Sequence, residues 1–206
     1  MPKITSFSEK PQYLAKERRK LLADRYWNLK KTVVLVGMMG AGKTAVGKAL
    51  AARLDVPFLD SDAEIEKAAN MTIAEIFQRD GEAFFRDRET EVIDRLLDNH
   101  CAILSTGGGA FMAERNRVLI SQKGVSVWLN ADMDILWSRV KGKNTRPLLR
   151  TSNPYQTLRA LYDARVPTYA LADLTVRART EYSIDAMAGQ VQEALLGRPD
   201  VLESIE

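Results

Sequence analysis

Residues 37–44 read Gly-Met-Met-Gly-Ala-Gly-Lys-Thr and fit G-x-x-x-x-G-K-[ST], the pattern of a loop that wraps a polyphosphate. Glycines let such a loop turn tightly and point backbone N–H groups at an anion, which the following helix N-terminus also attracts. Lys43 would reach the β- and γ-phosphates, and the Thr44 hydroxyl would bind the Mg²⁺ that the phosphates bring. The expected nucleotide-binding residues of this loop are Gly37, Gly40, Ala41, Gly42, Lys43, Thr44 and Ala45.

The alternative is a glycine-containing turn that matches the pattern by accident, and the flanking sequence argues against it. Residues 32–36 form a β-branched apolar run that ends at the loop. Residues 43–54 then carry helical spacing through Val46, Leu50 and Leu54. A phosphate loop requires a strand, the loop and a helix in that order, and all three are present.

Composition limits the class of protein. With 206 residues and 46% hydrophobic content, the chain can bury one substantial core. The formal charge of +3 argues against nucleic acid as the main partner. No apolar run reaches the ~20 residues of a membrane span, and residues 1–31 lack a secretion signal's apolar core, so we expect a cytoplasmic protein. Cys101 is the only cysteine and His100 the only histidine, which excludes disulfides within the chain and Cys/His metal clusters. Cys101 opens an apolar run and is expected to be buried.

The order of apolar runs predicts an α/β fold. Five short runs read as strands, at residues 33–36, 57–59, 102–104, 125–129 and 174–176. Helical patterns lie between them, which implies crossover connections and a mostly parallel sheet covered on both faces. The prediction is a three-layer α/β/α domain over residues 32–196.

Other segments extend this domain. Residues 1–31 are predicted to form a helical extension, with helical spacing over 12–29, that docks on the domain or on a second subunit; a monomer is expected, with a dimer through this helix as the alternative. Residues 62–99 read as an inserted helical region with a capping box at Thr72 and Glu75 and a break at Gly81. Residues 141–154 read as a flap or lid, and 197–206 as a tail.

Asp60 and Asp62 follow the second expected strand at the carboxyl edge of the sheet, where open α/β folds bind ligands. With a period of two, both carboxylates point the same way if the strand continues that far. The alternative is that Asp62 simply caps the next helix. The neighbouring phosphate loop favours the ligand-binding interpretation.

The third expected strand runs into Gly107, Gly108 and Gly109. Three glycines at a strand end are costly unless backbone must closely approach something, so we expect a ligand there rather than a merely flexible turn. Arg86 follows two aromatic residues, and Arg165 lies among apolar neighbours. Spacing alone leaves both arginines open between a site and the solvated surface.

Together these stretches resemble the shikimate kinase family, a branch of the nucleoside-monophosphate-kinase-like P-loop kinases. The resemblance covers residues 32–196 and rests on six motifs in the family's order. They are the phosphate loop, Leu-Asp-Ser-Asp at 59–62, Phe-Arg-x-x-Glu at 85–89, Gly-Gly-Gly at 107–109, Arg-Pro-Leu-Leu at 146–149 and Arg-x-Pro-x-Tyr at 165–169.

The resemblance implies a five-stranded sheet of order 2-3-1-4-5, a lid, and ATP-dependent phosphorylation of the 3-hydroxyl of shikimate in aromatic amino acid biosynthesis. It implies that Asp62, Arg86, Gly107, Gly108, Gly109 and Arg165 bind shikimate. Arg146 would be the lid arginine, Arg139 would lie near the adenine, and Asp60 would reach Mg²⁺ through water. Lys43, Asp62 and Arg146 are the expected catalytic residues.

The chemistry of phosphoryl transfer agrees with this assignment, because charge on the transferred group calls for cations and N–H donors more than a strong base. Asp62 at an unperturbed pKa of about 3.9 is poorly matched to remove the alcohol proton early, so we expect it mainly to align the attacking hydroxyl and to accept its proton late. Two alternatives remain at this point: a sibling kinase acting on gluconate or a nucleoside monophosphate, and a P-loop ATPase switch that drives a partner.

Overall fold

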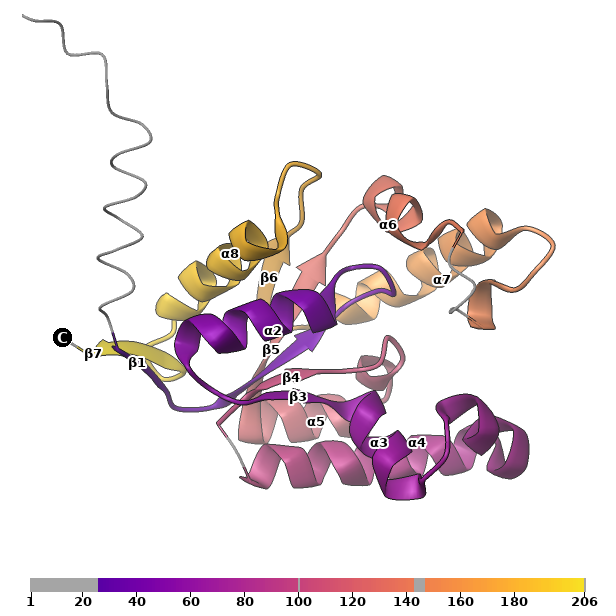
Figure 1. Cartoon of the computed structure of the whole chain (residues 1–206), viewed down its shortest axis with the longest axis horizontal. Coiled ribbons are helices and arrows are strands. Elements are labelled where there is room, and N and C mark those ends of the chain that lie inside the picture. The colour runs from indigo at the N-terminus through magenta and orange to yellow at the C-terminus, as the bar shows by residue number, and fades with distance from the viewer. Residues whose placement is uncertain (1–25, 100, 143–146, 206) are drawn as a thin grey trace, which may run out of the picture.

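The computed structural model describes residues 26–99, 101–142 and 147–205, and its elements are labelled as in Figure 1. Five parallel strands form the main sheet in the order β3-β4-β2-β5-β6. Counted from β2 as the first strand, this is the expected order 2-3-1-4-5, and every strand lies within one residue of its predicted bounds. The strands are β2 (Thr32–Val36), β3 (Phe58–Asp60), β4 (Ile103–Ser105), β5 (Gly124–Asn130) and β6 (Leu174–Arg177).

Helices cover both faces of this sheet (Figure 1). All residues of β2 and β4 are buried, as expected of central parallel strands that face helices on both sides. Helices α2 (Lys43–Leu54) and α8 (Ile184–Leu196) pack together on one face, and α4 (Ile73–Asn99) and α5 (Glu114–Lys123) lie together on the other. The predicted three-layer α/β/α domain is confirmed.

Strand register brings the expected site residues to one edge. Asp60 pairs with Ser105 between β3 and β4, and Leu35 of β2 also pairs with Ser105. Because the strands are parallel, the phosphate loop after β2, the end of β3 and the glycine turn after β4 leave the sheet side by side. Residues far apart in the sequence therefore meet at the carboxyl edge of the sheet.

The inserted helical region forms as predicted. It contains α3 (Ser61–Ala69) and α4, and the capping box is present: Thr72 Oγ1 accepts from the Glu75 N–H (3.3 Å), and Glu75 Oε2 accepts from the Thr72 N–H (2.8 Å). Gly81 breaks α4 with φ 82° and ψ 173°, a conformation that glycine adopts readily. The two helices share a small apolar cluster, separate from the main core, of Ile65, Ile76 and Phe85.

The polypeptide after β5 forms α6 (Met133–Val140), the 3₁₀ turn η2 (Pro147–Leu149) and α7 (Pro154–Tyr169). The rings of Trp137 and Tyr155 meet edge to face at 5.3 Å and join α6 to the start of α7. The expected lid lies between these helices. Its arginine, Arg146, falls outside the described residues, so its role stays a prediction.

The expectation of helix up to residue 29 is wrong for the last four residues of that segment. Tyr26–Leu29 form strand β1, which pairs antiparallel with β7 (Leu202–Ile205) in a separate two-stranded sheet. Leu29 and Leu202 are buried and alternate with exposed Asn28 and Glu203, which is strand periodicity. The partner strand comes from the other end of the chain, so local spacing could not reveal the pairing. Residues 1–25 of the predicted extension lie outside the described residues.

Two smaller outcomes concern Cys101 and the membrane. Cys101 is exposed, contrary to expectation, because β4 begins only at Ile103 and Cys101 precedes the buried part of that run. Within the described part of the chain, no helix combines the length and the apolar character that crossing a membrane requires.

Candidate active site

The phosphate loop adopts the backbone that its glycines allow. Gly40 (φ 85°) and Gly42 (φ 97°) both have left-handed conformations, and a β-carbon on Gly40 would lie 2.8 Å from Val140. Gly42 precedes α2 and provides no side-chain cap, so the first N–H groups of this helix face the loop. A helix N-terminus of this kind attracts anions.

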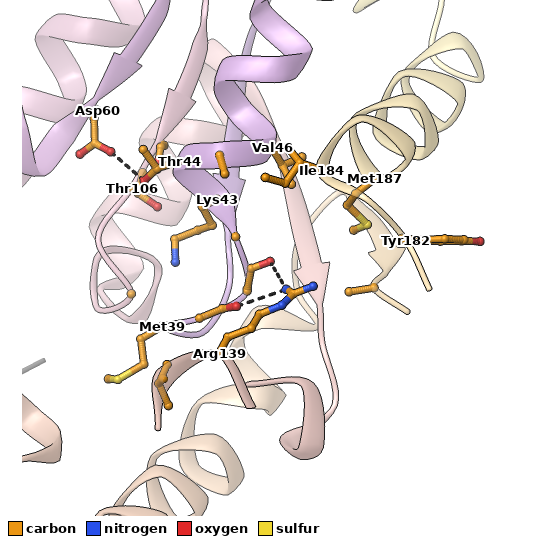
Figure 2. Close-up of a pocket in the computed structure, with 18 of the residues that line it drawn as sticks. Met39, Lys43, Thr44, Val46, Asp60, Thr106, Arg139, Tyr182, Ile184 and Met187 are labelled. Carbon is orange, nitrogen blue, oxygen red and sulfur yellow. Dashed lines mark hydrogen bonds between the residues drawn. The ribbon is translucent and has the colours of Figure 1, made fainter. Parts of the chain in front are cut away.

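Two cations lie against the loop. Lys43 Nζ donates to the carbonyl oxygens of Gly37 (2.7 Å) and Met38 (3.2 Å), which holds the ammonium group inside the curve of the loop. Arg139 reaches over from α6, and its Nη1 donates to the carbonyl oxygens of Gly40 (3.3 Å) and Ala41 (3.2 Å) (Figure 2). The phosphate loop therefore has two positive charges beside it, one from its own Lys43 and one from Arg139 of α6.

Hydroxyl and carboxylate oxygens gather beside the loop. Thr44 Oγ1 donates to Asp60 Oδ2 at 3.2 Å (Figure 2). The same hydroxyl lies 3.4 Å from Ser105 Oγ. Oxygen ligands of this kind suit Mg²⁺, which normally takes one or two protein groups and completes its shell with water and phosphate. Among the described residues, no cluster of three or more His, Cys, Asp or Glu side chains could hold a metal alone.

The two aspartates divide the roles that the sequence left open. β3 ends at Asp60, and Asp60 caps α3: its Oδ1 accepts from the N–H groups of Asp62 (3.1 Å) and Ala63 (3.4 Å). The cap is therefore Asp60, not Asp62, and the period-two argument fails because the strand stops before Asp62. Asp62 lies in the first turn of α3, and it lines the cleft.

The pKa of Asp62 departs from the value assumed from the sequence. Burial, followed by the negative charge of Asp60, raises this pKa from 3.8 to about 6, although Lys43 and Arg86 oppose the shift. An aspartate with this pKa is better matched to accept an alcohol proton than one at 3.9. The pKa of about 3.9 assumed for Asp62 is corrected accordingly, and its role in aligning the hydroxyl and accepting the proton stays a prediction.

Arg86 is held on α4 by two carboxylates. Its Nη1 donates to Glu89 Oε2 (2.8 Å) and its Nη2 to Glu82 Oε1 (3.1 Å). Glu89 is 1% exposed, and burial raises its pKa while Arg86 lowers it. These contacts orient the guanidinium toward the glycine turn.

The three glycines after β4 each face a different predicted side chain. A β-carbon on Gly107 would lie 2.7 Å from Asp62 Oδ1, and one on Gly109 would lie 2.7 Å from Arg86 Nη2. At Gly108 the nearest side-chain atom would be Arg165 Nη1, at 3.7 Å. Asp62 and Arg86 thus exclude a side chain at Gly107 and Gly109, whereas the contact at Gly108 is an ordinary one.

Arg165 and Tyr169 come from α7 one helical turn apart and share one acceptor, the Gly108 carbonyl oxygen. Arg165 Nη1 donates to it at 3.4 Å, and the Tyr169 hydroxyl also donates to it. Tyr169 is fully buried, which raises its pKa to about 12 and keeps the hydroxyl protonated. Tyr169 ends the Arg-x-Pro-x-Tyr motif, and the sequence alone predicts no role for it; its spacing of four residues from Arg165 is the one signal that places both side chains on the same face of a helix.

A cleft of about 450 Å³ joins these parts. Its lining includes Lys43, Thr44, Asp60, Asp62, Gly107, Gly108 and Arg139. Arg86, Gly109 and Arg165 are not in the lining; Arg86 lies against Gly109, and Arg165 donates to the carbonyl oxygen of Gly108, which is in the lining. The opposite end, unforeseen from the sequence, is formed by the start of α8 and the loop before it; its residues include Arg179, Tyr182, Ile184 and Met187.

Comparison with known proteins gives consistent results. The family model described as shikimate kinase matches residues 39–196. A shikimate kinase of Ruegeria pomeroyi is 68% identical over 175 residues, 85% of this chain and 90% of the relative. One of Cereibacter sphaeroides is 66% identical over 178 residues, 86% of this chain and 89% of the relative. A solved shikimate kinase of Acinetobacter baumannii in complex with shikimate has a TM-score of 0.76 at 37% identity, covering 86% of this chain and 97% of its own.

Proposed function

The chain belongs to the shikimate kinase family, and we propose that the cleft described above transfers the γ-phosphoryl group of ATP to the 3-hydroxyl of shikimate. One observation carries the residue assignment. Asp62, Arg86 and Arg165 converge on a single turn of three glycines, beside a loop that carries Lys43. A small polyhydroxylated acid needs such a combination of carboxylate, guanidinium groups and backbone donors next to the phosphate to be transferred.

ATP is proposed to bind along the cleft from the phosphate loop toward α8. The loop N–H groups and the start of α2 hold the β- and γ-phosphates, with Lys43 and Arg139 as cations. The adenine is assigned to the end near Arg139, Ile184 and Met187, where apolar side chains meet a guanidinium. Arg146 is assigned as the lid arginine, an assignment that rests on the family pattern.

Mg²⁺ is the cofactor we propose, with Thr44 as a direct ligand and Asp60 reaching it through water. The oxygen donors at this point fit a hard cation, since Thr44 and Asp60 already lie within hydrogen-bond distance. When bound, Mg²⁺ neutralises charge on the β- and γ-phosphates. The remaining steps are assigned to residues of the chain itself.

Asp62 is proposed to align the 3-hydroxyl and to accept its proton. The hydroxyl oxygen attacks the γ-phosphorus, the bond to the bridging oxygen of ADP breaks, and the proton moves to a carboxylate oxygen of Asp62. A pKa of about 6 suits this transfer near neutral pH, where the carboxylate is mostly ionised before the reaction. Lys43 stabilises the charge on the phosphoryl oxygens as the bond breaks.

The carboxylate of shikimate is assigned to Arg86 and Arg165. Glu89 and Glu82 orient Arg86, and the Gly108 carbonyl oxygen orients Arg165. N–H groups of the turn at Gly107, Gly108 and Gly109 are proposed to contact the ring hydroxyls. Without a side chain on these glycines, a ligand can approach the backbone closely.

Release of ADP by the purified chain, measured with different acceptors, tests the proposal. We expect turnover with ATP, Mg²⁺ and shikimate, and none with gluconate, nucleoside monophosphates or no acceptor. Turnover with a different acceptor would identify a sibling kinase, and hydrolysis without acceptor would identify an ATPase. Lys43→Ala is the control for contaminating kinases, and its kcat should fall by at least about 100-fold while ATP still binds.

Oligomeric state and location stay predictions. A monomer is proposed, and light scattering of the purified chain would reveal a dimer. A cytoplasmic location, expected from the sequence, agrees with a kinase that uses ATP.

A further inference from the structure

Asn116, on α5, is a buried polar residue outside the proposed site. Its side chain is 0% exposed and both of its polar atoms are hydrogen bonded. Nδ2 donates to the Ala110 carbonyl oxygen (2.9 Å), and Oδ1 accepts from Thr90 Oγ1 (2.7 Å). Reversing the amide would set Oδ1 against the Ala110 carbonyl oxygen, so these contacts fix the orientation.

The two partners of Asn116 belong to the two elements that hold the acceptor. Ala110 follows Gly109 directly, and its N–H donates to the Gly107 carbonyl oxygen (3.2 Å), which closes the glycine turn. Thr90 lies on α4 one turn after Arg86, and its Oγ1 is 3.0 Å from the Arg86 carbonyl oxygen. Asn116 therefore links the turn to the stretch of helix that carries Arg86.

Arg86 of α4 lies close against the glycine turn. A β-carbon on Gly109 would lie 2.7 Å from Arg86 Nη2, so the guanidinium already rests against the turn. A shift of α4 toward the turn would press the guanidinium further against it, and a shift away would move Arg86 from the turn. Either movement changes where the guanidinium meets a bound carboxylate, and misplacement by 1 Å can cost a large factor in activity.

A second residue of α5 holds the rest of the turn. Arg117 Nη1 donates to the carbonyl oxygens of Phe111 (2.9 Å) and Met112 (2.8 Å). Together with Asn116, it satisfies all three carbonyl groups of the 3₁₀ turn η1 (Ala110–Met112). The turn is thereby fastened to α5, and Thr90 fastens α5 to α4, which lies beside it (Figure 1).

We infer that Asn116 is a positioning residue for the acceptor, which fixes the glycine turn against Arg86 through its hydrogen bonds with Ala110 and Thr90. This inference rests on the proposed function, because it takes shikimate as the ligand of that turn. It adds a role for two residues, Asn116 and Thr90, that belong to none of the six sequence motifs.

The test measures shikimate binding by calorimetry and both KM values in Thr90→Val, Thr90→Ser and Asn116→Ala. Thr90→Val removes the hydroxyl at nearly constant shape and is the variant least able to disturb folding. We expect it to raise the Kd and KM for shikimate by roughly 3- to 10-fold, the range of one hydrogen bond, and to leave the ATP KM within twofold. Thr90→Ser retains the hydroxyl and should bind shikimate nearly as the wild type does.

Ser126→Ala is the matched structural control. Ser126 is a buried residue of β5 that hydrogen bonds to Asp173 (2.6 Å), away from the glycine turn. It should lower the melting temperature but keep the ratio of the two KM values. If Thr90→Val and Asn116→Ala behave in the same way as Ser126→Ala, both residues only support the fold and the inference is wrong.

A double-mutant cycle supplies the second criterion. Since Thr90 is proposed to act through Asn116, the double variant Thr90→Val, Asn116→Ala should bind shikimate about as weakly as Asn116→Ala alone. Fully additive effects would contradict the link. If the wild-type chain binds no shikimate, the proposed function fails together with this inference; if it binds and Thr90→Val binds equally well, only the inference fails.

Discussion

The guanidinium of Arg86 lies where a side chain on Gly109 would have to be. A β-carbon on Gly109 would be 2.7 Å from Arg86 Nη2 and 2.8 Å from Nη1, closer than non-bonded atoms approach. Gly109 has an ordinary φ of −95°, so the backbone alone would accept alanine. The glycine is required by its neighbour, and this gives a direct test of the acceptor site.

Gly109→Ala should displace Arg86 without straining the turn. Because the end of a long side chain yields easily, the fold should keep its stability, while the shikimate KM should rise about tenfold through the displaced guanidinium. Gly189→Ala, on α8 and outside the lining of the cleft, is the matched control, since its β-carbon would meet another guanidinium, Arg53 Nη2, at an ordinary 3.6 Å. Steady-state kinetics with both substrates would check this, and equal effects of the two substitutions would contradict it.

Much of this fold and site could be predicted because the signals are local. The phosphate loop, the capping box of Thr72 and Glu75 and the break at Gly81 each depend on residues within a few positions. The parallel sheet follows from apolar runs separated by helical patterns. These features needed no knowledge of which segments pack together.

The features that were missed depend on contacts between distant residues. β1 forms because Leu202–Ile205 pair with it. A local sequence pattern cannot predict a pairing with residues so far away in the chain. The hydrogen bond from Tyr169 to the Gly108 carbonyl oxygen and the raised pKa of Asp62 likewise arise from packing between elements. Burial and proximity of this kind follow from the fold and cannot be read from spacing.

Asp62 should lower the stability of the ligand-free chain at neutral pH. Folding raises its pKa from 3.8 to about 6. The stability that the protonated form gives to the folded chain is therefore fully present below about pH 4 and is lost as pH rises through 6. Above this range the ionised, buried carboxylate lowers the free energy of unfolding by up to about 3 kcal/mol. Asp62→Asn should therefore be more stable than wild type at pH 8 and about equally stable at pH 4.

Urea unfolding of the metal-free chain at pH 4, 6 and 8 would check this expectation. Asp163→Asn, on the exposed surface of α7, controls for the loss of a carboxylate as such. A stability difference between Asp62→Asn and wild type that is constant over this pH range would rule out the proposed cause. Asp62→Asn should also lose most of its kcat, because the amide cannot accept the proton.

The β1–β7 ribbon should contribute to stability but not to catalysis. Deleting residues 1–29 removes β1 and the buried side chain of Leu29, which should cost about 2 to 4 kcal/mol. All described site residues lie downstream, so kcat/KM should stay within about tenfold of the full chain. Deletion of residues 1–25 leaves β1 intact and is the matched comparison. A folded but inactive 1–29 deletion would show that the ribbon belongs to the catalytic unit.

The carboxylate of the acceptor is the group that Arg86 and Arg165 are proposed to recognise. A hydrogen bond to a charged group contributes about 1.5 to 3 kcal/mol, so Arg165→Met should raise the shikimate KM by roughly 10- to 150-fold and leave the ATP KM nearly unchanged. Arg86→Met should do the same, but it also strands Glu89, which is 1% exposed and pairs with Arg86 at 2.8 Å. The double variant Arg86→Met, Glu89→Gln removes that buried charge and separates lost recognition from lost stability.

An acceptor whose carboxylate is reduced to an alcohol gives the decisive comparison. Wild type should use this alcohol poorly, because two guanidinium groups then face a neutral partner. Arg165→Met should lower kcat/KM for the alcohol only slightly further, since the carboxylate that the arginine binds is already absent. The measurement is the ratio of kcat/KM for shikimate to that for the alcohol, in wild type and in each variant. If Arg165→Met loses as much on the alcohol as on shikimate, Arg165 supports the turn through the Gly108 carbonyl oxygen and does not read the carboxylate.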